Sequence, residues 1–200
     1  MYTLINGSPK YINSNSLYFL NIISKYLDKS SIFNLKNDDY EKIITSIKSS
    51  HTIVLAFPLY VDSPTSITLE FMDYLFDNEI NLKNKKIFVI INCGFREGQQ
   101  NITALNIVKN WCLKMNVIYK GAILIGAGEI VGKRKYKLVS KKALKNLFYF
   151  GSAISNDKNT GDIITTMDYL DNKTYVFLAN RNWNKKSKAN GLTLELVRKK

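Results

Sequence analysis

The sequence predicts a parallel, doubly wound α/β sheet with helices on both faces. One observation is a strict alternation of strand-like and helical patterns, which repeats five times between residue 2 and about residue 154. Another is that the runs 52–57 and 86–92 are almost entirely apolar, as strands covered on both faces are. Such alternation implies parallel strands joined by right-handed crossovers.

Each element follows from its own pattern. Short apolar runs predict strands at 2–6, 32–35, 52–57, 86–92 and 119–125. Apolar residues at helical spacing predict helices at 14–28, 39–48 and 141–154, of which 39–48 has the clearest amphipathic stripe. Two further helices are marked by Ile67, Phe71 and Leu75, and by Leu105, Val108, Cys112 and Met115.

The remainder of the chain does not continue the alternation. We therefore expect one domain over 1–155 and a C-terminal extension over 156–200, packed on the domain or on a dimer partner. The extension has one expected helix, from about Lys173 to Ala189, with Gly191 just past its end.

Composition narrows the function classes. Only Cys93 and Cys112 are present, which favours a reducing, cytoplasmic setting, and no apolar run approaches the ~20 residues of a membrane span. The net charge of +13 comes largely from scattered lysines and the last twenty residues, so we expect neither a nucleic-acid nor a membrane partner. With His51 as the only histidine, neither a metal site nor a protein nucleophile is expected.

Three loops follow the first, third and fourth expected strands, at the edge where doubly wound sheets bind ligands. The first, 7–16, offers Ser and Asn side chains just before a helix, whose unpaired N–H groups and partial positive charge attract phosphate. The same residues also suit a plain capped connection that binds nothing.

The second and third loops, 58–66 and 93–101, suggest a slot for a flat ring. Tyr60 can offer an aromatic face between the apolar Leu59 and Val61, and Phe95 adds another aromatic. Gly94 lets the backbone approach a ligand closely. Alternatively, Tyr60 and Phe95 only pack the edge of the sheet.

Taken together, the three loops resemble the flavodoxin-like NAD(P)H-dependent FMN reductases over about residues 1–155. The resemblance implies a five-stranded sheet in the order 2-1-3-4-5, bound FMN, and NADH or NADPH as co-substrate. It also implies transfer of hydride through FMN to a small acceptor, such as a flavin or a quinone. The matching residues, which it implies to be cofactor-binding, are Ser8, Pro9, Lys10, Ser14, Asn15, Ser16, Pro58, Leu59, Tyr60, Val61, Asp62, Asn92, Cys93, Gly94, Phe95 and Glu97.

Some features depart from that family or leave the function open. Pro64-Thr65 replaces a more usual order and puts the start of the third helix in doubt, and the Cys cluster of iron–sulfur relatives is absent. An electron-transfer flavoprotein reduced by a partner protein and a flavin-free binding module on the same fold remain alternatives. Cys93 is expected to be a small buried thiol, with a redox role as the alternative.

Two further segments have expected roles. Residues 126–132 are glycine-rich but do not fit a dinucleotide fingerprint, so we expect a flexible loop near the site. It is followed at 133–137 by an expected basic, solvated turn, with contact to the extra phosphate of NADPH or to an acidic redox partner as the alternative. A homodimer whose partner narrows the flavin site is expected from apolar residues in apparent surplus. These are Phe71, Tyr74, Leu75, Phe76 and Trp111, with Tyr169, Leu170, Tyr175, Phe177, Leu178 and Trp183 in the tail.

Overall fold

The computed structural model describes residues 1–10, 12–131, 140–167, 169 and 171–192. The chain forms two compact units, Met1–Met167 and Asp168–Lys200. The first unit contains the whole sheet, and the second contains helix α7 (Asn172–Ala189). The expected basic turn at 133–137 lies outside the described residues.

The sheet has six parallel strands in the order β2-β1-β3-β4-β5-β6. The expected order of the first five strands is confirmed, but the expectation of only five strands is wrong. The strands are β1 (Tyr2–Asn6), β2 (Ser30–Asn34), β3 (Thr52–Pro58), β4 (Lys86–Asn92), β5 (Ile118–Ile125) and β6 (Gly161–Thr165).

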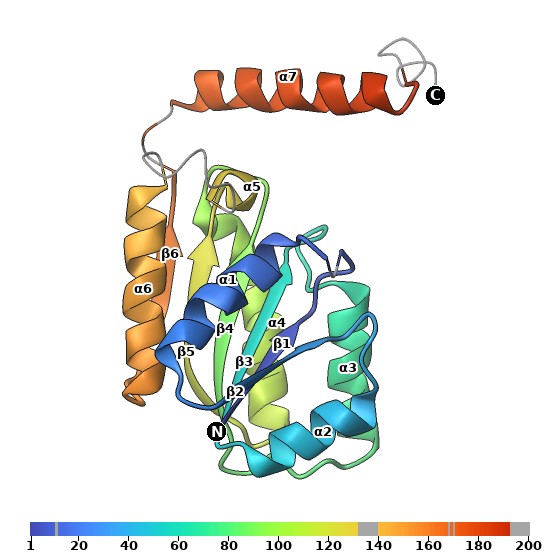
Figure 1. Ribbon diagram of the computed structural model, residues 1–200, viewed down its shortest axis with the longest axis vertical. Coiled ribbons are helices and arrows are strands. Elements are labelled where there is room, and N and C mark those ends of the chain that lie inside the picture. Colours follow the sequence, from blue (N-terminus) through green and yellow to red (C-terminus); the bar gives the residue numbers. More distant parts are fainter. Residues whose placement is uncertain (11, 132–139, 168, 170, 193–200) are drawn as a thin grey trace. The chain divides into compact units, whose positions relative to one another are not determined.

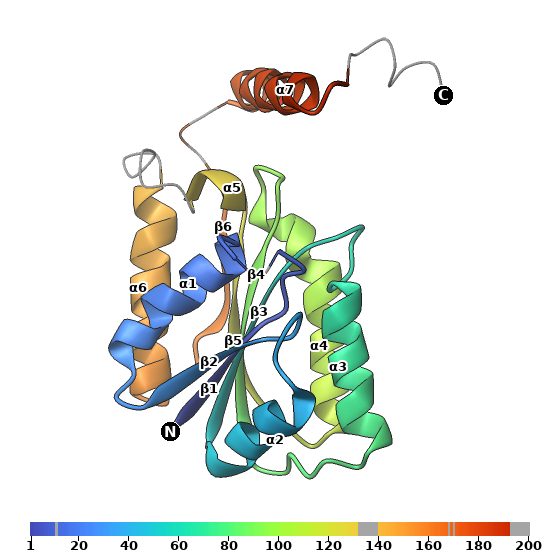
Figure 2. The same ribbon diagram turned by 45° about the vertical axis from the view of Figure 1, so that its right-hand side comes forward.

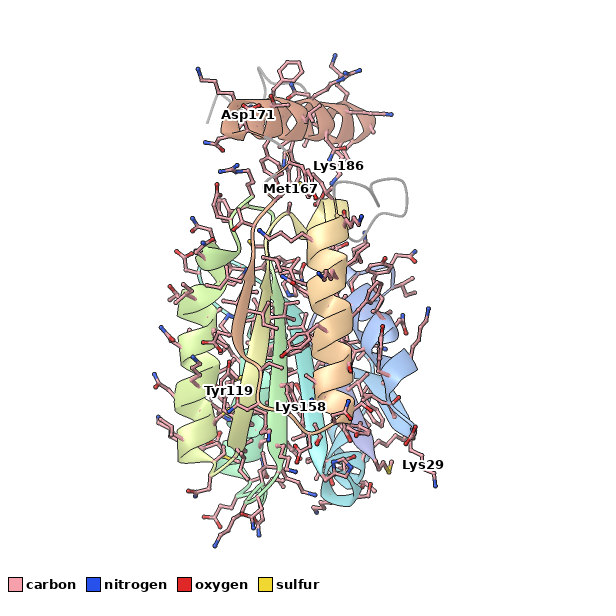
Figure 3. All side chains as sticks on the ribbon, turned by 90° about the vertical axis from the view of Figure 1, so that its left-hand side faces the viewer. Lys29, Tyr119, Lys158, Met167, Asp171 and Lys186 are labelled. Carbon is pink, nitrogen blue, oxygen red and sulfur yellow. The ribbon has the colours of Figure 1, made fainter. Side chains whose placement is uncertain are left out.

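Strand β6 was missed because it is a largely exposed edge strand without an apolar run. Polar contacts help to hold it. Asp162 accepts hydrogen bonds from the Tyr119 hydroxyl of β5 at 2.5 Å and from Lys109 Nζ at 2.6 Å. Burial, followed by the bond to Asp162, raises the pKa of Tyr119, so the phenol stays protonated and donates. Figure 3 views this edge, with Tyr119 labelled toward one end of the sheet and Met167 toward the other.

The helices cover the sheet in two layers. Helices α1 and α6 lie on one face, and α2, α3 and α4 lie on the other (Figures 1 and 2). The helices of this unit are α1 (Asn15–Ile23), η1 (Ser24–Tyr26), α2 (Tyr40–Ser49), α3 (Ser66–Asp77), η2 (Gly98–Asn101), α4 (Ile102–Lys114), α5 (Gly128–Val131) and α6 (Lys141–Ser155). None of the described helices is both long and apolar enough to cross a bilayer.

Successive residues of a strand point to opposite faces of the sheet. They therefore contribute alternately to the apolar cores on its two sides. Ile53 and Leu55 join the large cluster under α2, α3 and α4. Toward the opposite layer, Phe88 of β4 meets Phe150 of α6 edge to face, with ring centroids 5.7 Å apart. Both rings are fully buried, so the sheet and α6 pack closely at this point.

Several of the apolar residues that were expected to be surplus belong to this core. Phe71 and Leu75 of α3 are buried in the cluster, as is Trp111 of α4, whose Nε1–H donates to the Met72 carbonyl at 3.0 Å. The expectation that they form spare surface is wrong, because α3 and α4 pack their apolar stripes onto the sheet. Phe76 does remain about half exposed.

Candidate functional site

The three informative loops leave neighbouring strands at the carboxyl edge of the sheet. Asn6 at the end of β1 pairs in register with Ala56 of β3, and Pro58 of β3 pairs with Asn92 of β4. Because the strands are parallel, the loops that follow them are brought together.

The first loop ends in a well-formed helix start. Ser14 is the N-cap of α1, with its Oγ accepting a hydrogen bond from the Leu17 N–H at 3.1 Å. The first N–H groups of a helix lack partners within it. Within the described residues, the backbone N–H groups of Asn15 and Ser16 have no hydrogen-bond acceptor. No acidic residue occurs between residues 7 and 16. This helix start therefore suits a phosphate.

The side chain of Asn6, at the end of β1, makes hydrogen bonds that hold the first loop. Asn6 was not among the expected site residues. Its Oδ1 accepts from the Ser8 N–H at 3.1 Å, and its Nδ2 donates to Asn34 Oδ1 at 2.8 Å and to Ser14 Oγ at 3.4 Å. Asn6 is fully buried, and its side chain connects the first loop to β2. The sequence signal for this role is weak: Asn6 is a polar residue at the end of an apolar strand, at the carboxyl edge of the sheet.

Gly7 is required by close packing. A Cβ at this position would lie 2.1 Å from Thr68 Oγ1 and 3.2 Å from the Phe57 Cβ. The Gly7 carbonyl accepts hydrogen bonds from the hydroxyls of Thr65 at 2.6 Å and Thr68 at 3.3 Å. These bonds attach the first loop to the beginning of α3, which starts at Ser66 despite the unusual Pro64-Thr65 pair.

Asn92 is the residue that joins all three loops. Its Nδ2 donates to Ser16 Oγ at 3.0 Å and to the Phe57 carbonyl at 3.2 Å, and the residue is buried. On its other side, a Cβ at Gly128 would lie 2.8 Å from Asn92 Oδ1. Asn92, which was expected to be cofactor-binding, thus connects the end of β4 to Ser16 at the end of the first loop and to β3.

The second loop is a tight hairpin. Tyr60 and Ser63 exchange two backbone hydrogen bonds of 3.1 Å, and Val61 and Asp62 both have positive φ, 49° and 59°. Positive φ in both central residues matches a type I′ turn and is strained for the β-branched Val61. Tyr60 is half exposed and Val61 is 98% exposed, whereas Leu59 belongs to the core.

The third loop is held by a buried thiol. Cys93 Sγ lies 3.7 Å from the Phe95 carbonyl and 3.6 Å from the Glu97 carbonyl, and Asn101 Nδ2 donates to it at 3.5 Å. Burial raises the pKa of Cys93, which keeps the thiol neutral at physiological pH. The structure therefore agrees with the expectation of a small buried thiol.

The tip of this loop is open. Gly94 is exposed, a Cβ built on it meets nothing within 4 Å, and Phe95 is 56% exposed. Glu97 pairs with Arg96 Nε at 2.9 Å. The carboxyl edge thus has exposed aromatics in two loops, Tyr60 and Phe95, beside open backbone at Gly94. Of the other expected site residues, Pro9 is half-buried and Lys10 is exposed in the first loop.

The glycine-rich segment after β5 supports the third loop. Gly128 N–H donates to the Cys93 carbonyl at 2.8 Å, and Ala127 N–H donates to the Phe95 carbonyl at 2.5 Å. From Gly128 the chain forms the single turn α5, so the expectation of a loop throughout is wrong. A Cβ at Gly126 would approach the Arg96 carbonyl oxygen to 2.2 Å, which explains the glycine there.

The end of β6 closes the same loop from outside. Met167 N–H donates to the Arg96 carbonyl at 3.1 Å, and Thr166 Oγ1 donates to Gln99 Oε1 at 3.0 Å. A Cβ at Gly98 would lie 2.5 Å from the Thr165 carbonyl oxygen. These contacts were not expected from the sequence, because they depend on a strand that the pattern does not reveal.

Comparison with known proteins identifies the family. Residues 3–129 match the sequence profile of the family described as NADPH-dependent FMN reductase. The chain belongs to this family. It is therefore an oxidoreductase of the NADPH-dependent FMN reductase family, as the resemblance of the loops predicts. No curated protein sequence matches the chain significantly.

Solved structures share the fold at low identity. An NADPH-quinone reductase from P. pentosaceus is 15% identical, with a TM-score of 0.60 over 80% of this chain and 99% of that one. An FMN-dependent NADH-azoreductase from Bacillus anthracis, solved in complex with FMN, is 14% identical, with a TM-score of 0.55 over 78% and 98%. A flavodoxin, WrbA-like protein from Agrobacterium tumefaciens is 9% identical, with a TM-score of 0.58 over 78% and 96%.

The residues present fit the cofactor of this family. The buried hydroxyls of Ser14 and Ser16 lie at a helix start that has free N–H groups and no acidic neighbour in the loop, which suits a phosphate monoester. The exposed rings of Tyr60 and Phe95 and the open backbone at Gly94 suit a flat aromatic ring.

Proposed function

We propose that this protein transfers hydride from NADH or NADPH through bound FMN to a small acceptor such as free flavin or a quinone. The observation that carries the proposal is the Asn92 side chain, which ties the helix start at Ser16 to the carboxyl ends of β3 and β4. These buried hydrogen bonds connect the loop that would bind the phosphate to the strand ends that would border the ring, which supports the proposal.

FMN supplies the redox chemistry when it is bound, because its ring accepts and returns a hydride equivalent. The chain's own contribution is position and electrostatics. The N–H groups of Asn15 and Ser16 and the side chains of Ser8, Ser14 and Ser16 would bind the phosphate. Tyr60, Phe95 and the backbone of Gly94 would border the ring, together with Pro58, Val61, Asp62 and Glu97.

No side chain of the protein needs to donate or remove a proton during hydride transfer. The groups beside the ring agree with this: the Cys93 thiol is buried and neutral, and Glu97 is paired with Arg96. Backbone N–H groups of the second and third loops would instead stabilise negative charge on the ring.

The test is spectroscopic. Purified protein reconstituted with FMN should show the bound-flavin absorbance bands, and NADH or NADPH alone should bleach them under anaerobic conditions. Bleaching that requires a reduced partner protein would instead make this an electron-transfer flavoprotein. Failure to bind FMN at all would leave a binding module on the same fold.

A further inference from the structure

The third loop is attached to the rest of its unit through its carbonyl oxygens. The carbonyls of Cys93 and Phe95 accept hydrogen bonds from the segment that follows β5, and the Arg96 carbonyl accepts one from the Met167 N–H at 3.1 Å. All three donors come from the β5–β6 side of the loop. The carbonyls of this loop are therefore turned toward β5 and β6.

The peptide unit between Arg96 and Glu97 has a fixed orientation as a result. A trans peptide unit is planar, and its C=O and N–H point in opposite directions. Because the Arg96 carbonyl is held toward β6, the Glu97 N–H is directed away from β6. The strand order β3-β4-β5-β6 places β3 and the second loop on that side. Within the described residues, the Glu97 N–H has no hydrogen-bond acceptor.

The donor of this bond is itself held in place. Met167 follows the carboxyl end of β6, on the sheet edge seen in Figure 3. Two residues earlier, the Thr165 carbonyl accepts from the Gly126 N–H at 2.9 Å, and Thr165 Oγ1 donates to the Leu124 carbonyl at 3.0 Å. Thr165 and Met167 are both buried. The Met167 N–H is therefore anchored to β5 as well as to its own strand.

The next peptide unit of the loop is also bound by this segment. The Gly98 N–H donates to Thr166 Oγ1 at 3.5 Å, and the same hydroxyl donates to Gln99 Oε1 at 3.0 Å. Two successive peptide units of the third loop thus depend on residues 166 and 167, one through a side-chain hydroxyl and one through a backbone N–H.

The orientation of the Arg96–Glu97 unit matters because of charge. A hydride carries two electrons and one proton, so a site that receives a hydride gains one negative charge. N–H donors that already point at this charge stabilise it without reorganisation. A carbonyl oxygen in the same place would oppose it. The Glu97 N–H and the Arg96 carbonyl belong to one peptide unit, so its orientation decides which of them faces the ring site.

We propose that Met167 is a positioning residue for hydride transfer. Its N–H holds the Arg96 carbonyl toward β6 and thereby presents the Glu97 N–H to the ring of bound FMN as negative charge develops there. Met167 acts through this peptide unit and not by contact with the ring. The inference rests on the proposed function, and it adds that the end of β6 makes the redox potential of the site less negative.

Two substitutions at one position isolate the N–H group. Met167→Pro removes it, because proline has no backbone N–H. Met167→Ala removes the same buried side chain but keeps the N–H, so it is the matched control. Proline confines the residue before it to extended conformations, which suits Thr166 directly after a strand. Every comparison below is between these two variants.

The first measurement uses the flavin-free protein. Trypsin cleaves after arginine, so the bond between Arg96 and Glu97 is both the proposed peptide unit and a tryptic site. Brief digestion followed by mass spectrometry gives its cleavage rate, with cleavage after the exposed Lys29 as the internal reference. Loss of one neutral hydrogen bond should make cleavage at Arg96 about 2- to 10-fold faster in Met167→Pro than in Met167→Ala.

The second measurement is the midpoint potential of bound FMN. Hydrogen bonds to charged groups are stronger than neutral ones, so Met167→Pro should weaken binding of the reduced cofactor by about tenfold more than binding of the oxidised one. For a two-electron couple this corresponds to a potential about 30 mV more negative than in Met167→Ala. The ratio of FMN to riboflavin affinities should not change, because the first loop is untouched.

A milder variant keeps the test valid if thermal melts show that Met167→Pro does not fold. Thr166→Val removes the hydroxyl that binds Gly98 and Gln99 and preserves the shape of the side chain. It should change the cleavage rate and the potential in the same directions by smaller amounts. Thr166→Ser keeps the hydroxyl and should restore both values.

The possible failures can be told apart. Equal cleavage at Arg96 in the two Met167 variants would overturn the inference without any reference to flavin. Faster cleavage with an unchanged potential would also overturn it, since Met167 would then only stabilise the loop. If the unchanged protein binds no FMN, the proposed function fails together with this inference, and that result precedes any comparison of variants.

Discussion

The side-chain amide of Asn92 donates a hydrogen bond to the hydroxyl of Ser16, 76 residues earlier in the chain, at 3.0 Å. Both residues are buried, so this bond stays out of competition with water. It joins the end of a central strand to the first turn of α1, the two parts of the candidate site that must stay in register.

Replacing Asn92 with Ala should loosen that register. The change leaves the Phe57 carbonyl without a side-chain donor and removes the partner of Ser16, and a buried polar group left unpaired costs ~1–3 kcal/mol. We expect a lower urea midpoint for the apoprotein and weaker FMN binding by fluorescence titration. Asn37→Ala, at an exposed position, is the matched control. Unchanged FMN affinity in Asn92→Ala would remove this residue from the site.

Ser14 and Ser16 should discriminate FMN from riboflavin. Ser14→Ala removes the N-cap of α1, which lowers stability by ~0.5–2 kcal/mol, and both substitutions remove hydroxyls from the proposed phosphate site. The double variant should lose much more affinity for FMN than for riboflavin, which has no phosphate. Ser24→Ala, an accessible hydroxyl at the far end of α1, should affect neither ligand. Equal losses for both ligands would contradict the assigned phosphate position.

Tyr60 and Phe95 should matter for the ligand and little for the fold. Each side chain is about half exposed, so Tyr60→Ala or Phe95→Ala should change the unfolding midpoint only slightly. Contact of either ring with FMN contributes on the order of 1 kcal/mol beyond its buried area, so each change should shift the bound-flavin spectrum and redox potential. Tyr149→Ala, 57% exposed on α6, serves as the control. If neither site variant differs spectrally from the control, these rings lie outside the site.

Alkaline pH should destabilise the protein partly through Cys112. Burial raises the pKa of its thiol from the ordinary value of 9.0 to about 12. Between those values the unfolded chain loses the proton while the folded chain keeps it, so the free energy of unfolding falls as pH rises, by roughly 1.4 kcal/mol per pH unit at most. Urea titrations from pH 8 to 10.5 should therefore show a shallower decline for Cys112→Ala than for the unchanged protein. Parallel declines would exclude Cys112 as a source of the effect.

The sequence predicts the interior of the fold better than its edges. Runs such as 52–57 and 86–92 fix β3 and β4 almost to the residue, because strands covered on both faces must be continuously apolar. Strand β6 has no such run, and its attachment depends on Asp162, a polar residue that pattern analysis assigns to a loop. For helix α3 the prediction was wrong in the opposite direction, because Phe71 and Leu75 were expected to be surplus surface but are buried. An apolar stripe in the sequence does not show how much of the helix the sheet will cover.

The same limit applies to the candidate site. The loop residues, Asn92 among them, could be proposed because their motifs follow the strands in the same order as in the family that the chain resembles. The supporting residues Asn6, Thr65 and Asn101 were not, because one buried Asn or Thr near a strand end looks like any other until its partners are known. Gly7 is a further example, because the sequence alone does not show that Thr68 leaves no space for a side chain at this position.

The clamp formed by β6 on the Cys93–Asn101 loop has a consequence for biosynthesis. Residues 7–16 and the loop that follows β4 are both synthesised before β6. The anchors of that loop at Thr166 and Met167 are among the last parts of the first unit to be made. Parts of a chain that are synthesised earlier generally fold earlier, so the Cys93–Asn101 loop gains these anchors only when synthesis of the sheet is complete. A nascent chain interrupted before β6 would therefore lack these anchors, whereas the partners that hold residues 7–16, namely Asn6, Thr65 and Asn92, would already be present.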